Sequence, residues 1–294
     1  MKCQAASRSG AIFAIAALSV SVAFTAFGCG GKGDAKQGDQ SAKTAAASAA
    51  AGVGANAAKG VFAKEEFSDK TLAILSGSSF DAVARERVGA KLHKFFDSPA
   101  KSVEAVLAGE ADATVAEEPV ARKFASQNPD KLIVLYPPID IENYAPIFPK
   151  KDGGKMVGEF NTFLAAARSD GTTDDMIKRW IDTPDSPPMP DIELKNPKKR
   201  VLKFATSDCD PPFSMKDPNG KIVGFDVEMA LRFAQSIGCG LEVKVMDFAD
   251  IIPAVAAGTV DFAANVITIN EERKTVVDFS DPVYFGGTVV LVRK

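Results

Sequence analysis

One arginine stands in a segment whose residue types suit the binding of an anion. Arg273 follows Thr268 by five residues, and Glu271 and Glu272 lie between them. A guanidinium presents a planar fork of N–H donors that matches a carboxylate through two parallel hydrogen bonds. The alternative is a surface arginine in a charged helix start, because Lys274 continues the run of charges.

Two serines occupy a second position that suits an anion. Ser78 and Ser79 follow an apolar strand predicted at Lys70–Leu75 and precede a helix predicted from Asp81 to about Phe96. Their hydroxyl and amide groups can therefore face an anion at the start of that helix. A Gly-Ser-Ser sequence more often serves only as a helix cap.

Signals of catalysis are weak. The single histidine, His93, lies beside Lys91 and Lys94 on the same predicted helix, which indicates a solvated side chain. The sequence contains no histidine-rich metal cluster, no Gly-x-Ser-x-Gly motif and no phosphate-binding loop. A mechanism that uses carboxylates alone cannot be identified, because Asp and Glu are common. We expect no catalytic residue, no metal and no cofactor.

The N-terminus has the pattern of an export signal. Met1–Gly10 carries two cations and no acid, and Ala11–Gly28 is an almost unbroken apolar run. The run ends Ala26-Phe27-Gly28-Cys29, which resembles the lipobox of bacterial lipoproteins, in which the cysteine is acylated and becomes the new N-terminus. We expect removal of residues 1–28 and lipidation of Cys29. An uncleaved membrane anchor and an ordinary signal peptide are the alternatives.

Charge and cysteine content narrow the classes further. The net charge is −3, and loss of Lys2 and Arg8 with the signal makes it −5. The only basic run, at residues 198–200, indicates a solvated linker end and not a nucleic-acid surface. Cys209 and Cys239 should lie at opposite ends of neighbouring strands, roughly 20 Å apart at about 3.3 Å per residue. Disulfide Cα atoms approach within about 7 Å, so we expect two free thiols.

The elements that must position these residues form two blocks in which strands alternate with helices, which predicts an α/β fold. Residues 29–62 are rich in small and polar residues and predict a flexible tether. A proline-rich linker at 183–200 separates the blocks. Further strands are predicted at 113–116, 132–135, 145–148, 201–206, 241–245, 262–264 and 287–292, and further helices at 102–108, 118–126, 158–168, 174–181, 226–237 and 251–257.

Ordered motifs in both blocks point to one family. The second block contains, in order, PPF (211–213), NGKIVGFDV (219–227), DFADIIP (247–253), TINEER (268–273) and VDFSDPVY (277–284). This block resembles the first lobe of the periplasmic solute-binding proteins of the polar amino-acid-binding family. The first block resembles their second lobe, through SGSS (76–79), EEPVA (117–121), DGT (170–172) and IKRW (177–180). The resemblance implies the two-lobe α/β fold of type II periplasmic binding proteins.

The lobes stand in reversed order relative to that family. We expect the second lobe at 63–147, the return to the first lobe at 148–182, the linker at 183–200 and the first lobe at 201–294. This order indicates a circular permutation cut in one hinge crossing, and a truncated tandem protein is the alternative. If the blocks form one domain, Gly287–Val292 should lie beside Ala145–Phe148, and Arg273 should face Ser79 across a single cleft.

The resemblance also implies a ligand site. In the family, the arginine at the position of Arg273 holds the ligand α-carboxylate, and Thr268 and the backbone around Asn265 supply further contacts. Phe248 matches an aromatic residue that packs on the ligand side chain, and packing in the core is the alternative. Glu117 takes the place of an acid, usually Asp, that pairs with the ligand ammonium, and its neighbour Glu118 is the alternative.

Two positions of the site depart from the family. Asp210 stands where an aromatic residue usually completes the wall, and Ser207 stands where an acid is common. Asp208 and Asp210 therefore bring carboxylates to the cleft, which favours a polar or cationic ligand side chain unless they only cap a loop. Ser78 and Ser79 complete the predicted site.

The resemblance implies a periplasmic lipoprotein that captures an amino-acid-like small molecule for an ABC transporter permease. Its lipid would anchor it to the inner or the outer membrane, and nucleic acid is not an expected partner. Two other classes stay open. One is an enzyme of the same fold, such as a dehydratase-like protein, and the other is a ligand-sensing or interaction lipoprotein.

Overall fold

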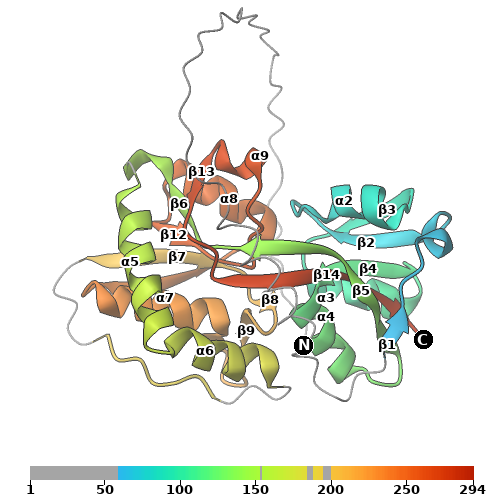
Figure 1. The fold of residues 1–294 in the computed structure, drawn as a ribbon, viewed down its shortest axis with the longest axis horizontal. Coiled ribbons are helices and arrows are strands. Elements are labelled where there is room, and N and C mark those ends of the chain that lie inside the picture. The colour runs from blue at the N-terminus through green and yellow to red at the C-terminus, as the bar shows by residue number, and fades with distance from the viewer. Residues whose placement is uncertain (1–58, 153, 184–187, 195–199) are drawn as a thin grey trace, which may run out of the picture.

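The computed structural model describes residues 59–152, 154–183, 188–194 and 200–294. These residues form two α/β lobes that are joined by two long strands (Figure 1). The predicted signal at 1–28, Cys29 and the rest of the predicted tether up to residue 58 lie outside the described residues. No helix in the described part of the chain combines the length and the apolar character needed to span a membrane.

The first lobe along the chain, here called the six-stranded lobe, has the strand order β1-β5-β14-β4-β2-β3. β2 is parallel to β3 and β4, β1 is parallel to β5, and β14 is antiparallel to both of its neighbours. Its elements are β1 (Lys59–Val61), η1 (Lys64–Phe67), β2 (Thr71–Leu75), α2 (Phe80–Val83), η2 (Ala84–Val88), β3 (Leu92–Phe96), α3 (Pro99–Ala108), β4 (Ala113–Glu117), α4 (Glu118–Gln127), β5 (Leu132–Tyr144) and β14 (Tyr284–Arg293).

The five-stranded lobe has the order β11-β7-β12-β6-β13, and a small three-stranded sheet, β10-β9-β8, belongs to the same part of the chain. Its elements are β6 (Ile147–Pro149), η3 (Lys150–Asp152), α5 (Lys155–Ser169), α6 (Thr172–Ile177), η4 (Lys178–Asp182), β7 (Val201–Thr206), β8 (Cys209–Asp210), β9 (Ser214–Lys216), β10 (Ile222–Val223), α7 (Phe225–Ser236), β11 (Gly240–Val245), α8 (Phe248–Ala257), β12 (Phe262–Ala263), α9 (Glu271–Lys274) and β13 (Val277–Phe279).

Each block of the sequence supplies strands to both lobes. β6 of the first block lies between β12 and β13 of the second, and β14 of the second block lies between β5 and β4 of the first. The apolar core of the five-stranded lobe is shared in the same way, because Phe148 stacks on Phe262 with ring centroids 5.7 Å apart and Phe160 packs against Phe233 at 5.0 Å. The two blocks therefore bury their apolar faces in one structure.

A buried carboxylate also joins the blocks. Glu228 on α7 accepts a hydrogen bond from the indole N–H of Trp180 at 2.7 Å and forms ion pairs with Arg179 at 3.2 Å and Arg232 at 2.8 Å. Glu228 is fully buried, and its three partners offset the cost of removing its charge from water. The contact fixes the end of the first block on a helix of the second.

β5 and β14 form the connection between the lobes and lie side by side across the middle of the molecule (Figure 1). Their pairing begins at Tyr284 and Tyr144 and is irregular between Thr288 and Val290. The expectation that residues 287–292 lie beside residues 145–148 is therefore wrong, because β5 continues nine residues beyond the predicted end at Leu135 and takes up this pairing itself.

Other differences from the predicted elements have local causes. The helix expected from Asp81 to Phe96 ends at Gly89, which adopts the left-handed conformation (φ 82°), and the chain then forms β3 on the edge of the sheet beside β2. β1 lies inside the segment predicted as tether, at residues 59–61, and pairs with β5.

The two cysteines differ from each other. β7 and β11 are parallel neighbours, and Cys239 is a buried free thiol, as predicted. Cys209 is disulfide-bonded, so the prediction of a second free thiol is wrong.

Candidate ligand-binding site

Arg273 lies where the two lobes meet. Asn270 caps the short helix α9 by accepting the Arg273 N–H at 2.8 Å, which turns the arginine inward, and the residue is only 8% exposed. Its Nη1 donates to the carbonyl of Thr268 in its own lobe at 3.0 Å, and its Nη2 donates to the carbonyl of Gly77 in the other lobe at 3.3 Å. One guanidinium thus connects both walls of the cleft.

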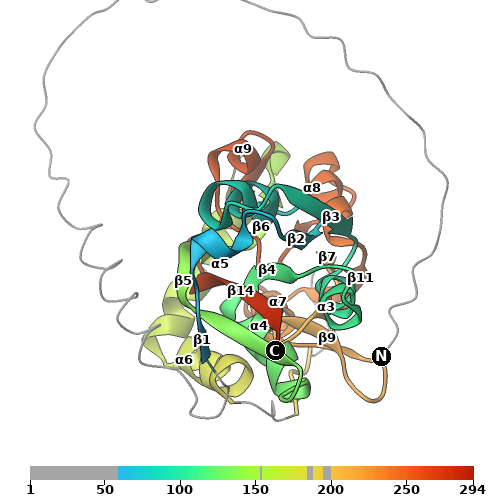
Figure 2. The ribbon, with the colours of Figure 1, turned by 90° about the vertical axis from the view of Figure 1, so that its right-hand side faces the viewer.

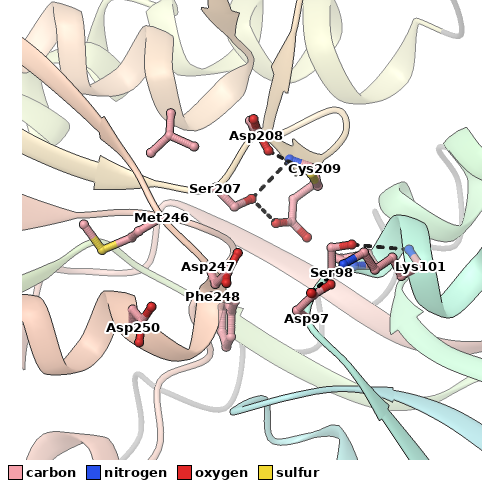
Figure 3. Close-up of a pocket in the computed structure, with 13 residues that line it drawn as sticks. Asp97, Ser98, Lys101, Ser207, Asp208, Cys209, Met246, Asp247, Phe248 and Asp250 are labelled. Atoms are coloured by element: carbon pink, nitrogen blue, oxygen red, sulfur yellow. Dashed lines mark hydrogen bonds and ion pairs between the residues drawn. The ribbon is translucent and has the colours of Figure 1, made fainter. Parts of the chain in front are cut away.

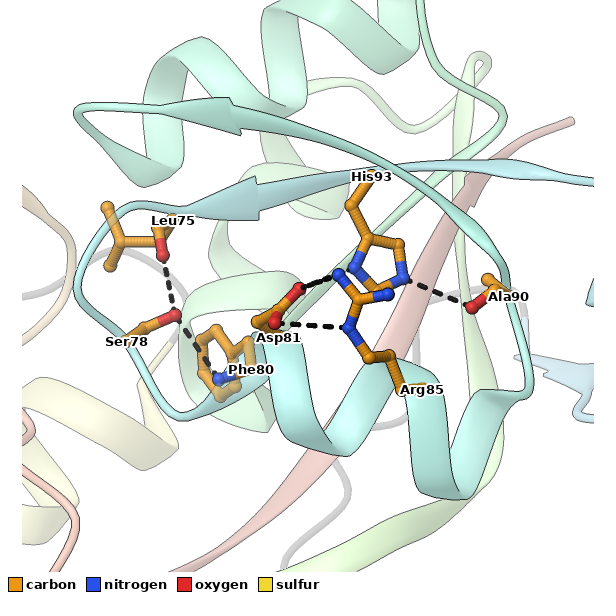
Figure 4. A network of polar contacts seen from close by, with 7 residues as sticks. All are labelled: Leu75, Ser78, Phe80, Asp81, Arg85, Ala90 and His93. Atoms are coloured by element: carbon orange, nitrogen blue, oxygen red, sulfur yellow. Dashed lines mark hydrogen bonds and ion pairs between the residues drawn. The ribbon is translucent and has the colours of Figure 1, made fainter. Parts of the chain in front are cut away.

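The loop that Arg273 reaches is the predicted serine loop. Ser78 donates its hydroxyl to the Leu75 carbonyl at 2.7 Å and accepts the Phe80 N–H at 3.3 Å, so its side chain shapes the turn (Figure 4). Ser79 precedes α2 without forming a side-chain cap. Arg273 meets this loop two residues before Ser79, as expected for residues on opposite walls of one cleft.

A hydrogen bond between His93 and Asp81 fastens the helix that follows the loop. His93 projects from β3 with a side chain that is 2% exposed, and its Nδ1 lies 2.5 Å from Asp81 on α2 (Figure 4). Its Nε2 lies 3.2 Å from the carbonyl of Ala90, and Arg85 binds the same Asp81 through Nε and Nη2. The hydrogen bonds of Arg85 and His93 lower the pKa of Asp81. The prediction of a solvated His93 on a helix is wrong, because this residue lies on a strand covered by α2.

Glu117 ends β4 inside the cleft. It is 7% exposed, and burial raises the pKa of its carboxyl group well above the ordinary range. The nearby carboxylates of Asp210 and Glu142 raise it further, whereas Arg273 opposes them. Glu118 does not share this environment, because it pairs with Arg122 at 2.8 Å and accepts the Tyr136 hydroxyl at 2.7 Å.

Ser207, Asp210 and Asn265 bind one another. Both the Ser207 hydroxyl and the Asn265 amide donate to Asp210 Oδ2, the latter at 2.7 Å, and the Asn265 carbonyl oxygen accepts the Ser207 N–H at 2.8 Å. Asp210 is 3% exposed, and burial raises the pKa of its carboxyl group. These three predicted site residues therefore form one buried polar cluster, and Ser207 and Asp210 line the cavity between the lobes.

Phe248 links Arg273 to a cavity between the lobes. The guanidinium carbon of Arg273 lies 5.8 Å from the centre of the Phe248 ring, which is within the range of a cation–π contact. The cavity beside Phe248 has a volume of about 270 Å³ (Figure 3). Its walls come from the turn before α3, the loop between β7 and β8, and the turn between β11 and α8.

The cavity is strongly acidic. It is lined by one lysine, Lys101, and by five aspartates, which are Asp97, Asp208, Asp210, Asp247 and Asp250. Lys101 pairs with Asp97 at 2.5 Å, and Lys216 pairs with Asp208 from outside. Burial, followed by the charges of Asp97 and Asp250, raises the pKa of Asp247. The remaining negative charge suits a cationic group, and we call this region the acidic pocket.

Sequence reasoning missed Glu142, which faces the same cleft. Its carboxylate accepts hydrogen bonds from Thr268 at 3.3 Å and from Thr288 at 2.9 Å. No motif marks this residue, and the predicted strand ended at Leu135, so nothing placed residue 142 between the lobes. The described part of the chain contains no group of three or more His, Cys, Asp or Glu side chains suited to a metal ion.

About a third of the chain is similar in sequence to known proteins. Residues 202–294 match the family model of bacterial extracellular solute-binding proteins, family 3. The chain is 34% identical over 103 residues to the arginine-binding protein ArgT of Corynebacterium glutamicum, covering 34% of each protein. It is 38% identical over 96 residues to the arginine-binding extracellular protein ArtP of Bacillus subtilis, covering 33% of this chain and 37% of ArtP. It also matches the L-cystine-binding protein TcyJ of Escherichia coli, at 34% identity over 29% of this chain and 32% of TcyJ.

These matches cover only part of each protein. The chain spans about a third of the length of these relatives. Among solved structures, it is similar to an ancestral arginine-binding protein bound to arginine, with 48% identity, a TM-score of 0.28, and coverage of 29% of this chain and 37% of that one. It is also similar to domain 1 of TmArgBP in its arginine-bound form, with 38% identity, a TM-score of 0.28, and coverage of 32% of this chain and 80% of that domain.

Proposed function

We propose that this protein, whose residues 202–294 belong to the bacterial extracellular solute-binding proteins of family 3, captures an amino acid between its two lobes. The observation that carries the proposal is the position of Arg273. A buried guanidinium that contacts both lobes can hold an α-carboxylate and close the cleft over it. Glu117 provides a carboxylate near it for the α-ammonium.

The acidic pocket supports a ligand with a cationic side chain. Asp247 and Asp250 form no ion pair within 4 Å among the described residues, and Asp210 lines the same cavity. A guanidinium or ammonium group that entered from the Phe248 side would relieve the repulsion between these carboxylates. Arginine-binding relatives agree with this preference. We therefore take L-arginine as the first probe.

Titration calorimetry of the protein against a panel of amino acids tests the proposal. We expect one binding site, L-arginine or L-lysine among the tightest ligands, and no turnover of the bound compound. Conversion of the ligand would favour the enzyme alternative. An absence of binding to every member of the panel would favour the interaction lipoprotein.

We also propose that the order of the chain arose by circular permutation. β6 of the first block lies in the sheet of the five-stranded lobe, and β14 of the second block lies in the sheet of the six-stranded lobe. This arrangement supports a permutation in which the chain was cut at one of the two connections between the lobes. Both views place the C-terminus near β1 (Figures 1 and 2). A reordered chain, residues 200–294 followed directly by 59–182, should fold as a monomer and bind the ligand of the native protein with similar affinity. Failure of the reordered monomer to bind would contradict this explanation.

We also place the protein at a membrane surface, where it would deliver its ligand to an ABC transporter permease. The signal-like N-terminus and Cys29 support a lipid anchor, and relatives in this family are transport binding proteins outside the cytoplasm. Metabolic labelling with a fatty acid should mark the wild-type protein and not Cys29→Ala. Equal labelling of the wild type and of Cys29→Ala would contradict lipidation of Cys29.

A further inference from the structure

The carboxylate of Glu142 is held by three hydroxyl groups from three segments. Tyr144 of β5 donates at 3.2 Å, Thr268 from the loop before α9 donates at 3.3 Å, and Thr288 of β14 donates at 2.9 Å. All three donors bind Oε2. The other oxygen, Oε1, therefore keeps its capacity to accept a hydrogen bond from a further group.

Glu142 is coupled to the predicted anchor of the ligand. Thr268 lies between them in space, because its carbonyl accepts from Arg273 and its hydroxyl donates to Glu142. Among the charges that raise the pKa of Arg273 against the effect of burial, Glu142 is the largest and Glu117 the next. Glu142 and Glu117 also repel each other. Two acidic groups thus lie within electrostatic range of one guanidinium.

The backbone around Glu142 is fixed to the wall that carries Arg273. Tyr144 and Thr268 form an isolated antiparallel bridge, Ile269 N–H donates to the Asn143 carbonyl at 2.9 Å, and Ala145 N–H donates to the Ile267 carbonyl at 3.1 Å. The position of Glu142 relative to the Arg273 loop therefore does not depend on its side-chain contacts alone.

We propose that Glu142 is a second carboxylate of the ammonium site, which binds the ligand α-ammonium together with Glu117. This inference rests on the proposed function. In an amino acid the ammonium and carboxylate groups are attached to the same carbon, so a carboxylate that pairs with the ammonium must lie beside the arginine that holds the carboxylate. Glu117 approaches from β4 and Glu142 from β5, and β14 runs between these strands. An ammonium has three N–H donors and can use both acids.

The competing explanation is that Glu142 only orients the three hydroxyl groups. That role does not need a negative charge, since the carbonyl oxygen of a glutamine accepts the same hydrogen bonds. Binding of an ammonium does need the charge, because a charge-assisted hydrogen bond is roughly twice as strong as a neutral one. Glu142→Gln therefore separates the two roles.

The test compares three related probes by titration calorimetry. L-arginine carries both α-groups, 5-guanidinopentanoic acid lacks the α-ammonium, and agmatine lacks the α-carboxylate. We expect Glu142→Gln to weaken L-arginine and agmatine by about tenfold or more and to leave 5-guanidinopentanoic acid within about twofold. Asp140→Asn is the matched control, because it removes a carboxylate from the same strand that pairs with Arg87 instead of the cleft residues. It should change none of the three affinities.

Each other outcome has a defined meaning. Equal weakening of all three probes by Glu142→Gln, or no weakening of L-arginine, would overturn the ammonium role and leave the proposed function standing. If the wild-type protein binds none of the three, a panel of the other amino acids supplies the probe and its des-amino analogue. If no amino acid binds the wild-type protein, the proposed function fails, and the role of Glu142 fails with it.

Discussion

The two ends of the cleft differ in how far their charged groups are buried. At the end around Arg273, which we call the anchor, Arg273 and Glu117 are buried and come from different blocks of the sequence. Arg273 also donates to backbone carbonyls of both lobes. In the acidic pocket most of the carboxylates stand on turns at the ends of strands and helices, and several reach solvent. Burial strengthens each charge interaction at the anchor, whereas water and salt weaken those in the pocket. The anchor should therefore decide whether a ligand binds, and the pocket which one.

The largest effect is expected at the anchor. Arg273→Ala removes the partner of the ligand carboxylate and leaves Glu117 and Glu142 without their cation. Loss of one member of a buried charge pair costs about 2–5 kcal/mol, so the affinity for L-arginine should fall at least 30-fold while the circular dichroism spectrum is retained. Lys274→Ala is the control, because Lys274 pairs with the exposed Glu271. An unchanged dissociation constant in Arg273→Ala would exclude this residue as the anchor.

A smaller and more selective effect is expected in the pocket. The double variant Asp208→Asn, Asp247→Asn should weaken L-arginine by about tenfold, and the loss should shrink in high salt. Binding of a neutral amino acid such as L-glutamine should change little. The control is a second double variant, Glu104→Gln with Glu110→Gln, which removes two exposed charges outside the pocket and should leave both affinities unchanged. Similar losses for arginine and glutamine would contradict a role of the pocket in selecting charge.

Closure of the cleft over the anchor can be disturbed without touching a charge. Gly77 has φ +77°, and a Cβ at this position would lie 3.0 Å from the Cα of Ala249 in the other lobe. Gly77→Ala should therefore weaken ligand binding by about 3- to 10-fold, through strain and the clash across the cleft. Gly220→Ala matches the strain, with φ +82°, but meets no neighbour within 4 Å. Equal affinities for the two variants would show that this contact does not limit closure.

The smallest effect concerns pH. Asp226 of α7 is buried and accepts the Val266 N–H at 3.1 Å, and burial raises its pKa from 3.8 to about 7. A raised carboxyl pKa in the folded state contributes stability at low pH, and this contribution is lost as the pH rises through about 7. Between pH 6 and pH 8, we expect the free energy of unfolding without ligand to fall by about 1.4 kcal/mol more in the wild type than in Asp226→Asn.

The control for that measurement is Asp250→Asn, which removes an exposed carboxylate of the acidic pocket. Urea unfolding at a series of pH values gives the free energies for all three proteins. If Asp226→Asn keeps the full pH dependence of the wild type, the Asp226 carboxyl group is not the source of that dependence.

Much of the fold follows from local patterns in the sequence. Strands such as β2, β4 and β7 are short apolar runs, and α3 carries its own stop signals, with Ser98 as cap, Pro99 in the first turn and Gly109 in the left-handed conformation at its end. Periodicity and capping depend on neighbours along the chain, so these elements were predictable. The family motifs supplied the pairing of the two lobes and most of the predicted site.

The remaining features depend on contacts that are distant in sequence. β5 extends to Tyr144 through a polar stretch because β14 covers it, and no local pattern marks that part as a strand. Glu142 gains its position from the same pairing. His93 is buried by Asp81 and Arg85 of a helix that precedes it, whereas its own neighbours are lysines. The position of a side chain whose contacts come from a distant segment could not be predicted from its neighbours in the sequence.

The buried side chain of His93 can serve as an intrinsic NMR probe of the protein. Since the chain contains a single histidine, its imidazole contributes one set of nitrogen and proton resonances, which need no assignment by mutation. The two ring nitrogens face a carboxylate and a carbonyl, and these two contacts fix the orientation of the ring. The helix held by this pair follows the loop that meets Arg273. A titration of ligand followed at this one resonance would therefore report movement of the six-stranded wall of the cleft, separately from events in the acidic pocket.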